Sequence, residues 1–347
     1  MKKKKQHQNK HIQNDLRAHS STNMKPKLTA ITTKLTKSKT KVYIQKSLAK
    51  NPWCAHGPTI LFERVCTENE SKKSSKFYAC SAYRDRKECG AFFQAADDAK
   101  CTVSKEKLLR WKRVLDHDSN VCRPQDPKTS QKDNEFYLPT LNRLLVSKHN
   151  STKEAQYHFS KDTLEVLLNQ FILHGNKKIR VVCVGTPKIH ESIIALKLKG
   201  TSTNVKSILL DIDVRLRPIY DSHTPTWGTF CHYNMFNHFF FRETERQDYL
   251  NFLKGNEDVL IVTDPPFGGK CELIGSTLHA IKSDIFKLRN IETNVNFMWI
   301  FPYYMERQIQ EAIPGIKMSD YQVCYETKVK NGYKDGLESG NSGCRKV

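Results

Sequence analysis

The sequence predicts an α/β fold, a mostly parallel sheet with helices on both faces, preceded by a small metal-stabilised module. From residue 154 onward, short apolar runs rich in β-branched residues alternate with helical segments, as they do in parallel sheets. Upstream, Cys and His recur at short spacings in a segment of about 45 residues. A segment of this size can bury only a small hydrophobic core, so we expect a bound metal to stabilise it. One late apolar run, 259–263, stops at an acid, two prolines and an aromatic residue.

Charge is concentrated at the N-terminus of this 347-residue chain, whose formal net charge is +21. Residues 1–50 contain 14 lysines or arginines and a single acidic residue. Such an arm is predicted to be disordered, to be attracted to phosphate and to act as a nuclear or nucleolar signal. We therefore expect a location in the nucleus or nucleolus, with the cytoplasm left open. No apolar run approaches membrane-spanning length, so no membrane partner is expected.

The domain organisation follows from shifts in composition along the chain. We expect a disordered basic arm at 1–50, a zinc finger at 51–95 and a linker region at 96–150. The α/β domain should occupy 151–328, and the polar, Gly-rich tail at 329–347 is expected to be disordered.

The small module carries a candidate metal site. The 11 cysteines, an odd number, favour thiols and metal ligands over disulfides in a chain without a secretory signal. Two ligands one residue apart precede a strand at 59–65 and a polar loop at 67–76, and two more follow. This order predicts a Cys3His tetrahedron for zinc, with Cys66 as an alternative ligand that is better interpreted as core. The predicted ligands are Cys54, His56, Cys80 and Cys89.

Aromatic and basic residues surround the last two of these cysteines. The pattern resembles a GRF-type zinc finger, a family that typically binds single-stranded nucleic acid, although Ala95 stands where that family carries an aromatic residue. These side chains would suit base stacking and phosphate contact, or they could form only the module's small core. They are Phe77, Tyr78, Arg84, Arg86, Lys87, Phe92 and Phe93.

The α/β domain is expected to begin with a helix opened by a capping box at Asp162 and ending near 174–175. A strand at 178–184 leads to Gly185, after which Thr186 could cap the next helix. Further strands are expected at 207–210, 231–233, 259–263 and 296–301, with helices at 243–253 and 273–288 and a final edge strand at 321–328.

The Asp-Pro-Pro-Phe segment, Asp264, Pro265, Pro266 and Phe267, forms a stiff extended exit from its strand, because proline fixes its own φ and restricts the preceding residue. Asp264 and the carbonyl of Pro265 could each accept an N–H of an exocyclic amine, while Phe267 stacks on the base. An ordinary strand exit is the alternative. The segment resembles the D-P-P-[FYW] motif of amino methyltransferases that use S-adenosylmethionine.

In such folds the first strand-to-helix turn touches the cofactor, and an acid about 20 residues later binds a ribose hydroxyl. Gly185 occupies that turn, and Asp211 follows the next strand directly. Asp213 is the alternative acid, less favoured because the turn is expected to expose it to solvent. The turn alone is a weak signal, since it lacks the three glycines of a dinucleotide-binding fingerprint.

Several segments in the same order carry a closer resemblance: Cys54-Ala-His-Gly-Pro-Thr, Val182-Cys-Val-Gly-Thr-Pro, Leu209-Leu-Asp-Ile-Asp, Cys231-His-Tyr-Asn-Met-Phe-Asn-His-Phe-Phe and Val262-Thr-Asp-Pro-Pro-Phe-Gly-Gly. They resemble the zinc-finger CCHC-domain-containing family of N6-adenine methyltransferases that act on large-subunit ribosomal RNA. The resemblance implies a class I (Rossmann-like) methyltransferase, S-adenosylmethionine as methyl donor and an rRNA adenosine as acceptor. It also implies cofactor contacts from Gln156, Tyr157, His158 and Phe159 and from Asn234 and Met235.

Two departures from this family leave an alternative open. A further Cys/His finger before the catalytic domain is not recognisable, and the tail does not resemble the family's Cys-rich continuation, so we expect a truncated form. A catalytically silent RNA-binding protein, using the basic arm and the finger, is the alternative to the enzyme; single-stranded DNA or a protein amide is an alternative acceptor. We expect a monomer, with accessory RNA-binding proteins as further partners.

Overall fold

The computed structural model describes residues 37–68, 71–83, 89–95, 159–173, 177–198, 204–217, 220, 229–266, 268–289, 293–325 and 345–346. The chain divides into two compact units, Met1–Lys37 and Ser38–Val347, and only Lys37 of the first is described. The predicted linker region, most of the arm and nearly all of the tail therefore lie outside the described residues. Among those described, no helix has the length and apolar character needed to cross a membrane.

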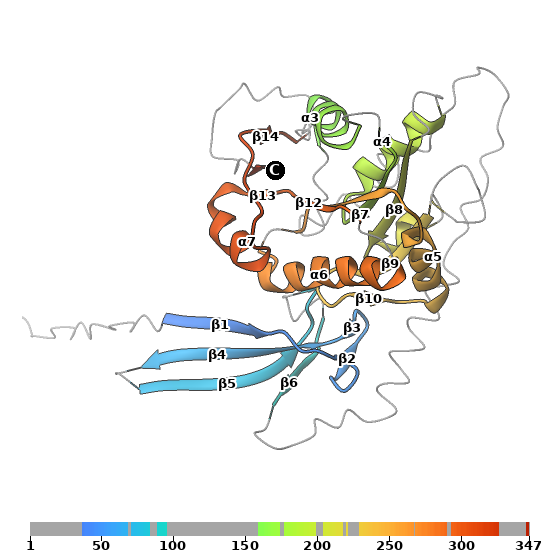
Figure 1. Ribbon diagram of the computed structural model, residues 1–347. Coiled ribbons are helices and arrows are strands. Elements are labelled where there is room, and N and C mark those ends of the chain that lie inside the picture. The colour runs from blue at the N-terminus through green and yellow to red at the C-terminus, as the bar shows by residue number, and fades with distance from the viewer. Residues whose placement is uncertain are drawn as a thin grey trace, which may run out of the picture. The chain divides into compact units, whose positions relative to one another are not determined.

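A six-stranded sheet forms the centre of the larger unit (Figure 1), with the order β10-β9-β8-β7-β11-β12. Its strands are β7 (Ile179–Val184), β8 (Val205–Asp211), β9 (Thr229–Asn234), β10 (Phe239–Phe240), β11 (Asp258–Thr263) and β12 (Val295–Trp299). All neighbours are parallel except β10, which pairs antiparallel with β9 at one edge. The order of the parallel strands reverses between β7 and β11, so the ligand-binding crevice of such a sheet is expected where these two strands end.

Helices cover both faces of this sheet, as the sequence predicts. Successive side chains on a strand point to opposite faces, so Val182 and Val184 pack on one side and Val181 and Cys183 on the other. The first face is covered by α5 (Glu243–Leu253) and α6 (Cys271–Leu288), and the second by α4 (Pro187–Leu198) and the helix around Leu167. These two layers of apolar residues form the core. The mostly parallel α/β fold is thus confirmed.

The N-terminal module is built on a four-stranded antiparallel sheet of order β1-β4-β5-β6, with β2 (Trp53–Cys54) and β3 (Gly57–Pro58) forming a separate hairpin. The predicted polar loop at 67–76 is wrong, because β4 (Ile60–Glu68) and β5 (Ser71–Ala79) pair along their whole length up to Glu68 and Ser71. Cross-strand pairing therefore overrides the polar composition of this stretch. Strand β1 (Lys37–Tyr43) lies within the range predicted as a disordered arm, and β6 (Phe92–Gln94) completes the sheet.

Two local predictions in the α/β domain also need correction. The first helix, α3 (Lys161–Val166), has Ser160 as its N-cap, because the Ser160 hydroxyl accepts the Thr163 N–H at 3.2 Å. The capping box predicted to begin at Asp162 is therefore wrong. The helix continues as a π-helix, η2 (Leu167–Ile172). Of the predicted edge strand at 321–328, residues 326–328 lie outside the described residues. The described part contains β14 (Gln322–Val323), which belongs to a small sheet with β13 (Phe301–Pro302) and β15 (Arg345–Lys346) rather than to the main one.

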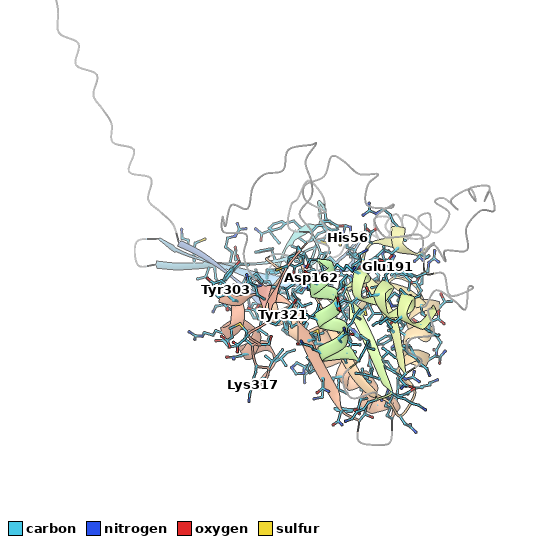
Figure 2. The ribbon with its side chains drawn as sticks, turned by 90° about the horizontal axis from the view of Figure 1, so that it is seen from above. His56, Asp162, Glu191, Tyr303, Lys317 and Tyr321 are labelled. Atoms are coloured by element: carbon cyan, nitrogen blue, oxygen red, sulfur yellow. The ribbon has the colours of Figure 1, made fainter. Side chains whose placement is uncertain are left out.

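The remaining described elements follow β8 and β12. They are η4 (Val214–Leu216), η5 (Tyr303–Met305) and α7 (Glu306–Ala312). Tyr303 and Lys317, labelled in Figure 2, line a surface groove beside η5 and α7.

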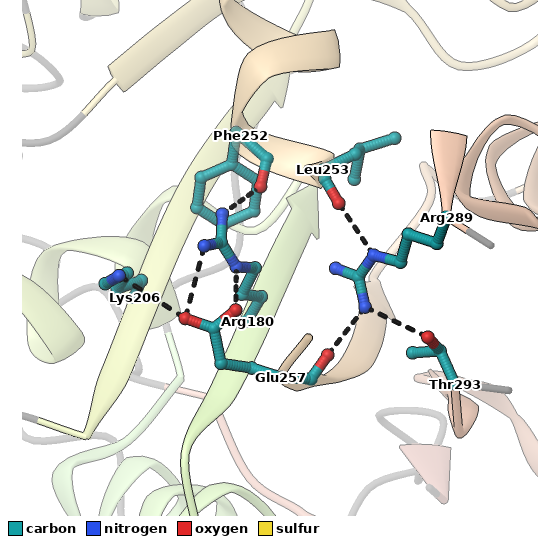
Figure 3. Close-up of polar contacts among 7 residues, drawn as sticks. All are labelled: Arg180, Lys206, Phe252, Leu253, Glu257, Arg289 and Thr293. Atoms are coloured by element: carbon teal, nitrogen blue, oxygen red, sulfur yellow. Dashed lines mark hydrogen bonds and ion pairs between the residues drawn. The ribbon is translucent and has the colours of Figure 1, made fainter. Parts of the chain in front are cut away.

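A polar network ties the segments that precede β11 (Figure 3). Arg180 binds both carboxylate oxygens of Glu257, at 2.7 and 3.1 Å, and also donates to the Phe252 carbonyl. The buried Arg289 donates to the carbonyls of Leu253 and Glu257 at 2.8 and 2.7 Å. Hydrogen bonds from Arg180 lower the pKa of Glu257 to about 2. These contacts fix where β11 starts, and thereby the register that places its far end at the site.

Candidate functional site

The turn after β7 has a backbone shape that glycine adopts readily. Gly185 has φ +66°, in the left-handed region, and its N–H donates to the Leu210 carbonyl at 2.9 Å. A Cβ added there would lie 2.5 Å from Met235 Cε and 3.8 Å from the Asp264 backbone carbonyl oxygen. The turn after β7, the turn after β9 and the end of β11 therefore meet at Gly185.

A buried carboxyl lies at the end of the neighbouring strand β8. Asp211 is 5% exposed, and burial raises its pKa to about 7 even though the Asp213 N–H donates to its Oδ1 at 2.8 Å. Asp213, the alternative acid, is engaged elsewhere: its Oδ1 accepts from Arg215 Nε at 2.7 Å and caps η4. Of these two acids, Asp211 ends β8 directly beside Gly185, whereas the Asp213 carboxylate is bound by Arg215.

The Asp-Pro-Pro segment leaves β11 at the same edge. Asp264 is half-buried, Pro265 buried and Pro266 exposed, whereas Phe267 lies outside the described residues. The Gly269 N–H donates to the Pro266 carbonyl at 3.0 Å, which closes a tight turn. The Asp264 backbone carbonyl thus lies next to the Gly185 turn, at the carboxyl end of β11.

Sequence reasoning missed one residue at this carboxylate. The Tyr325 hydroxyl donates to Asp264 Oδ2 at 3.3 Å, and the Tyr325 ring stacks on the buried Phe159 with centroids 5.3 Å apart. Phe159 and Tyr325 also form a backbone bridge. Phe159 thus contacts Tyr325, which in turn contacts Asp264, while Gln156, Tyr157 and His158 lie outside the described residues. No local pattern marks Tyr325, since 61 positions separate it from Asp264.

The turn after β9 places Asn234 and Met235 differently from each other. The Met235 side chain lies against Gly185, with its Cε 2.5 Å from a Cβ built there. Asn234 is fully buried, but its Nδ2 donates to the His56 carbonyl at 2.8 Å and its Oδ1 accepts from Phe236 N–H at 3.0 Å. The side-chain amide of Asn234 thus links the α/β domain to the N-terminal module.

The predicted metal ligands converge. The ligand atoms of Cys54, His56, Cys80 and Cys89 all lie within 4.8 Å of one another, and Cys80 Sγ is 3.5 Å from His56 Nδ1. Tetrahedral zinc with S and N ligands has ligand–ligand separations of about 3.3–3.8 Å. Cys66 is half-buried and lies outside this group.

The electrostatics of this cluster suit a divalent cation. Hydrogen bonds to Cys80 and Cys89 raise the pKa of Cys54, while the same kind of contact lowers the pKa of Cys89. Burial lowers the pKa of His56, but its contacts with Cys80 and Cys89 outweigh this and raise it to about 9. Three thiols packed this closely can all ionise only with a cation between them, so the donor set fits zinc.

These features define a Rossmann-like methyltransferase domain, with a glycine turn, a buried acid and an Asp-Pro-Pro exit at the carboxyl edge of a parallel sheet, beside a Cys/His module. Residues 150–337 match the family model described as "Probable N6-adenine methyltransferase". The chain belongs to this N6-adenine methyltransferase family.

Curated relatives include proteins named rRNA N(6)-adenosine-methyltransferase ZCCHC4. The chain is 35% identical to the Xenopus tropicalis protein over 324 residues, which cover 82% of this chain and 64% of that protein. It is 33% identical to the Homo sapiens protein over 324 residues, covering 82% and 61%, and 34% identical to the Mus musculus protein over 328 residues, covering 83% and 61%. The chain thus spans somewhat less than two thirds of the length of these relatives.

Proposed function

We propose that this chain transfers a methyl group from S-adenosylmethionine to N6 of an adenosine in large-subunit ribosomal RNA. Family membership implies the donor, and the names of the relatives support the acceptor. The observation that carries the proposal is the approach of the Asp264 backbone to the Gly185 turn. Because both lie at the carboxyl edge of adjacent strands, a donor at Gly185 and an acceptor amine at Asp264 would meet there.

The residues at this edge fit the cofactor. Gly185 offers a backbone surface without a side chain, and Asp211 would accept a ribose hydroxyl. Met235 would line the adenine pocket, and Asn234 would shape it from behind through the turn it stabilises. The segment Gln156, Tyr157, His158 and Phe159 would close over the bound molecule. S-adenosylmethionine, when bound, supplies an electrophilic methyl group.

The Asp264 exit would activate the acceptor amine by orienting it. Adenine N6 is a poor nucleophile because its lone pair is delocalised into the ring. If the Asp264 carboxylate and the Pro265 carbonyl each accept one N–H, the lone pair turns toward the methyl group. Phe267 would stack on the base, and Tyr325 would orient the carboxylate. The target adenosine has to be unpaired or flipped out to enter.

The Cys/His module would hold zinc through Cys54, His56, Cys80 and Cys89 in a structural site with no open position. Its aromatic and basic residues would contact the RNA by stacking and by phosphate pairing. We also propose a nuclear or nucleolar location, which the basic N-terminal arm supports and which imaging of the tagged full chain would test.

Methyl transfer itself tests the proposed function. Purified full chain is incubated with labelled S-adenosylmethionine and deproteinised ribosomal RNA, and the RNA is then digested to nucleosides. Label in N6-methyladenosine, absent with Asp264→Ala, is the expected result. Absence of label, with S-adenosylhomocysteine still bound, would contradict the proposal and favour a silent RNA-binding protein.

A further inference from the structure

The turn formed by residues 234–238, between β9 and β10, contacts the metal-ligand loop of the N-terminal module. Asn234 Nδ2 donates to the carbonyl of His56, one of the predicted ligands, at 2.8 Å. Asn237 Nδ2 donates to the carbonyl of Pro58 at 2.9 Å. Two side-chain amides from one turn thus hold the backbone on both sides of Gly57.

Packing reinforces these two hydrogen bonds. Gly57 has φ +93°, and a Cβ added to it would lie 2.5 Å from the Phe239 ring. Trp53 meets the same ring edge-to-face, with centroids 5.0 Å apart. The hairpin that carries Cys54 and His56 is therefore seated on β10 with no space for a side chain at Gly57.

The same turn contacts both parts of the candidate active site. Met235 Cε lies 2.5 Å from a Cβ built on Gly185, in the proposed cofactor turn. Phe236 is 7% exposed, and its ring lies 3.1 Å from a Cβ built on Gly269, in the turn that follows Asp264. A shift of the 234–238 turn would thus displace side chains that contact both Gly185 and Gly269, on the two sides of the proposed pocket.

The end of this turn is also held from within the catalytic domain. His238 has φ +50°, an uncommon conformation that persists only where several contacts impose it. Its Nδ1 lies 2.7 Å from the Tyr233 hydroxyl and its Nε2 lies 3.2 Å from Asp284 Oδ2, which also accepts from the Tyr249 hydroxyl. With one end fixed to α6, the position of residues 234–237 depends on the contacts at the other end.

We propose that Asn234 and Asn237 make the metal-ligand loop a structural support of the cofactor pocket, so that metal occupancy sets affinity for S-adenosylmethionine. This inference rests on the proposed function. Metal binding orders its ligand loop, and the loop presents the His56 and Pro58 carbonyls to the two amides. Without the metal these carbonyls lose their fixed positions, and the turn that carries Met235 and Phe236 loosens. By linkage, the cofactor must strengthen metal binding by the same factor.

The test uses the full chain and two readouts, neither of which is catalysis. Calorimetry measures the affinity for S-adenosylhomocysteine before and after zinc removal, and a zinc-sensitive dye measures chelator-induced zinc release with and without S-adenosylhomocysteine. Near-ultraviolet circular dichroism reports whether the stripped chain stays folded. Asn237→Ala removes one link but no metal ligand. Asn251→Ala is the matched control, because Asn251 is exposed on α5 and, within the described part of the chain, its side chain accepts hydrogen bonds from Gln247 and Lys254, which lie near it in sequence.

Zinc removal should weaken S-adenosylhomocysteine binding by about fivefold or more, the value of one to two hydrogen bonds, and the cofactor product should oppose zinc release by a similar factor. Asn237→Ala should bind S-adenosylhomocysteine about fivefold more weakly with zinc still stoichiometric, and should show less dependence on zinc. Asn251→Ala should behave as the wild type.

Equal affinity with and without zinc in a folded chain would overturn the inference, as would full zinc dependence in Asn237→Ala. If the zinc-free chain unfolds, the test rests on zinc-loaded Asn237→Ala. Weaker binding of S-adenosylhomocysteine by this variant supports the proposed coupling, and unchanged binding refutes it. Failure of the zinc-loaded wild type to bind S-adenosylhomocysteine would instead refute the proposed function, and this inference with it.

Discussion

Gly185→Ala tests whether the turn after β7 is the cofactor turn. An L-residue in the left-handed region costs about 1–2 kcal/mol, and the new Cβ would also push Met235 Cε away from 2.5 Å. The free protein can relieve part of this strain by relaxing the turn, but binding of S-adenosylhomocysteine must restore the strained conformation of the turn. We therefore expect unfolding free energy to fall by about 1–2 kcal/mol and S-adenosylhomocysteine affinity to fall about 5- to 30-fold.

Gly315→Ala is the matched control. Gly315 has φ +91°, but a Cβ added to it would meet nothing within 4 Å. The same backbone strain is thus imposed away from the proposed pocket. Urea unfolding should show a similar loss of stability for both variants, while calorimetry should show weakened binding for Gly185→Ala alone. Unchanged binding in Gly185→Ala, or equal weakening in Gly315→Ala, would refute the assignment.

Four further variants address the buried acid, the metal cluster and the ionic network. Burial raises the pKa of Asp211 to about 7, so the folded chain holds that proton more tightly and stability falls as pH rises from about 4 to 7. Asp211→Asn should remove this pH-dependent fall in stability while weakening cofactor binding. In urea titrations at pH 8 the ligand-free variant should be more stable than the wild type by at most about 4 kcal/mol. A pH profile of stability like that of the wild type would contradict this prediction. Cys80→Ser should lose stoichiometric zinc by elemental analysis and Cys66→Ser should keep it, since Cys66 lies outside the cluster; the reverse result would reject the ligand set. Arg180 lowers the pKa of Glu257 to about 2, so the stability this pair gives is present above about pH 4.5 and is lost as pH falls toward 2. Glu257→Gln should therefore cost about 1–3 kcal/mol at pH 7 and little near pH 2, and an equal cost at both pH values would show that the charge is not responsible.

Local patterns in the sequence predicted the frame of the fold and the metal site. β-branched runs predicted β7 and β11, because buried parallel strands need apolar side chains on both faces. Ligand spacing predicted Cys54, His56, Cys80 and Cys89, which the structure brings together. The motif at Asp264 was placed correctly at a strand end, because proline restricts its own backbone and that of its neighbour.

Contacts between distant residues could not be predicted from local patterns. The pairing of Thr67 with Lys72 depends on a partner strand rather than on composition, so the local composition predicts a loop where the structure has a hairpin. Asn234 reaches the His56 carbonyl across 178 positions, and a buried amide has the same local sequence whether it faces a cofactor or another module. Tyr325 contacts Asp264 because the segment after β14 pairs with Phe159, which places it at the sheet edge.

The most direct test of the central claim is the single-turnover rate of methyl transfer by Asp264→Asn at saturating cofactor and RNA. This rate isolates the chemical step from binding and product release. The asparagine keeps the size of the side chain but places an N–H donor where an acceptor for the amine is required. We predict a rate about 10²–10³-fold below wild type, with S-adenosylhomocysteine affinity within about twofold of it. A wild-type rate of N6-methyladenosine formation in this variant would contradict the role assigned to Asp264.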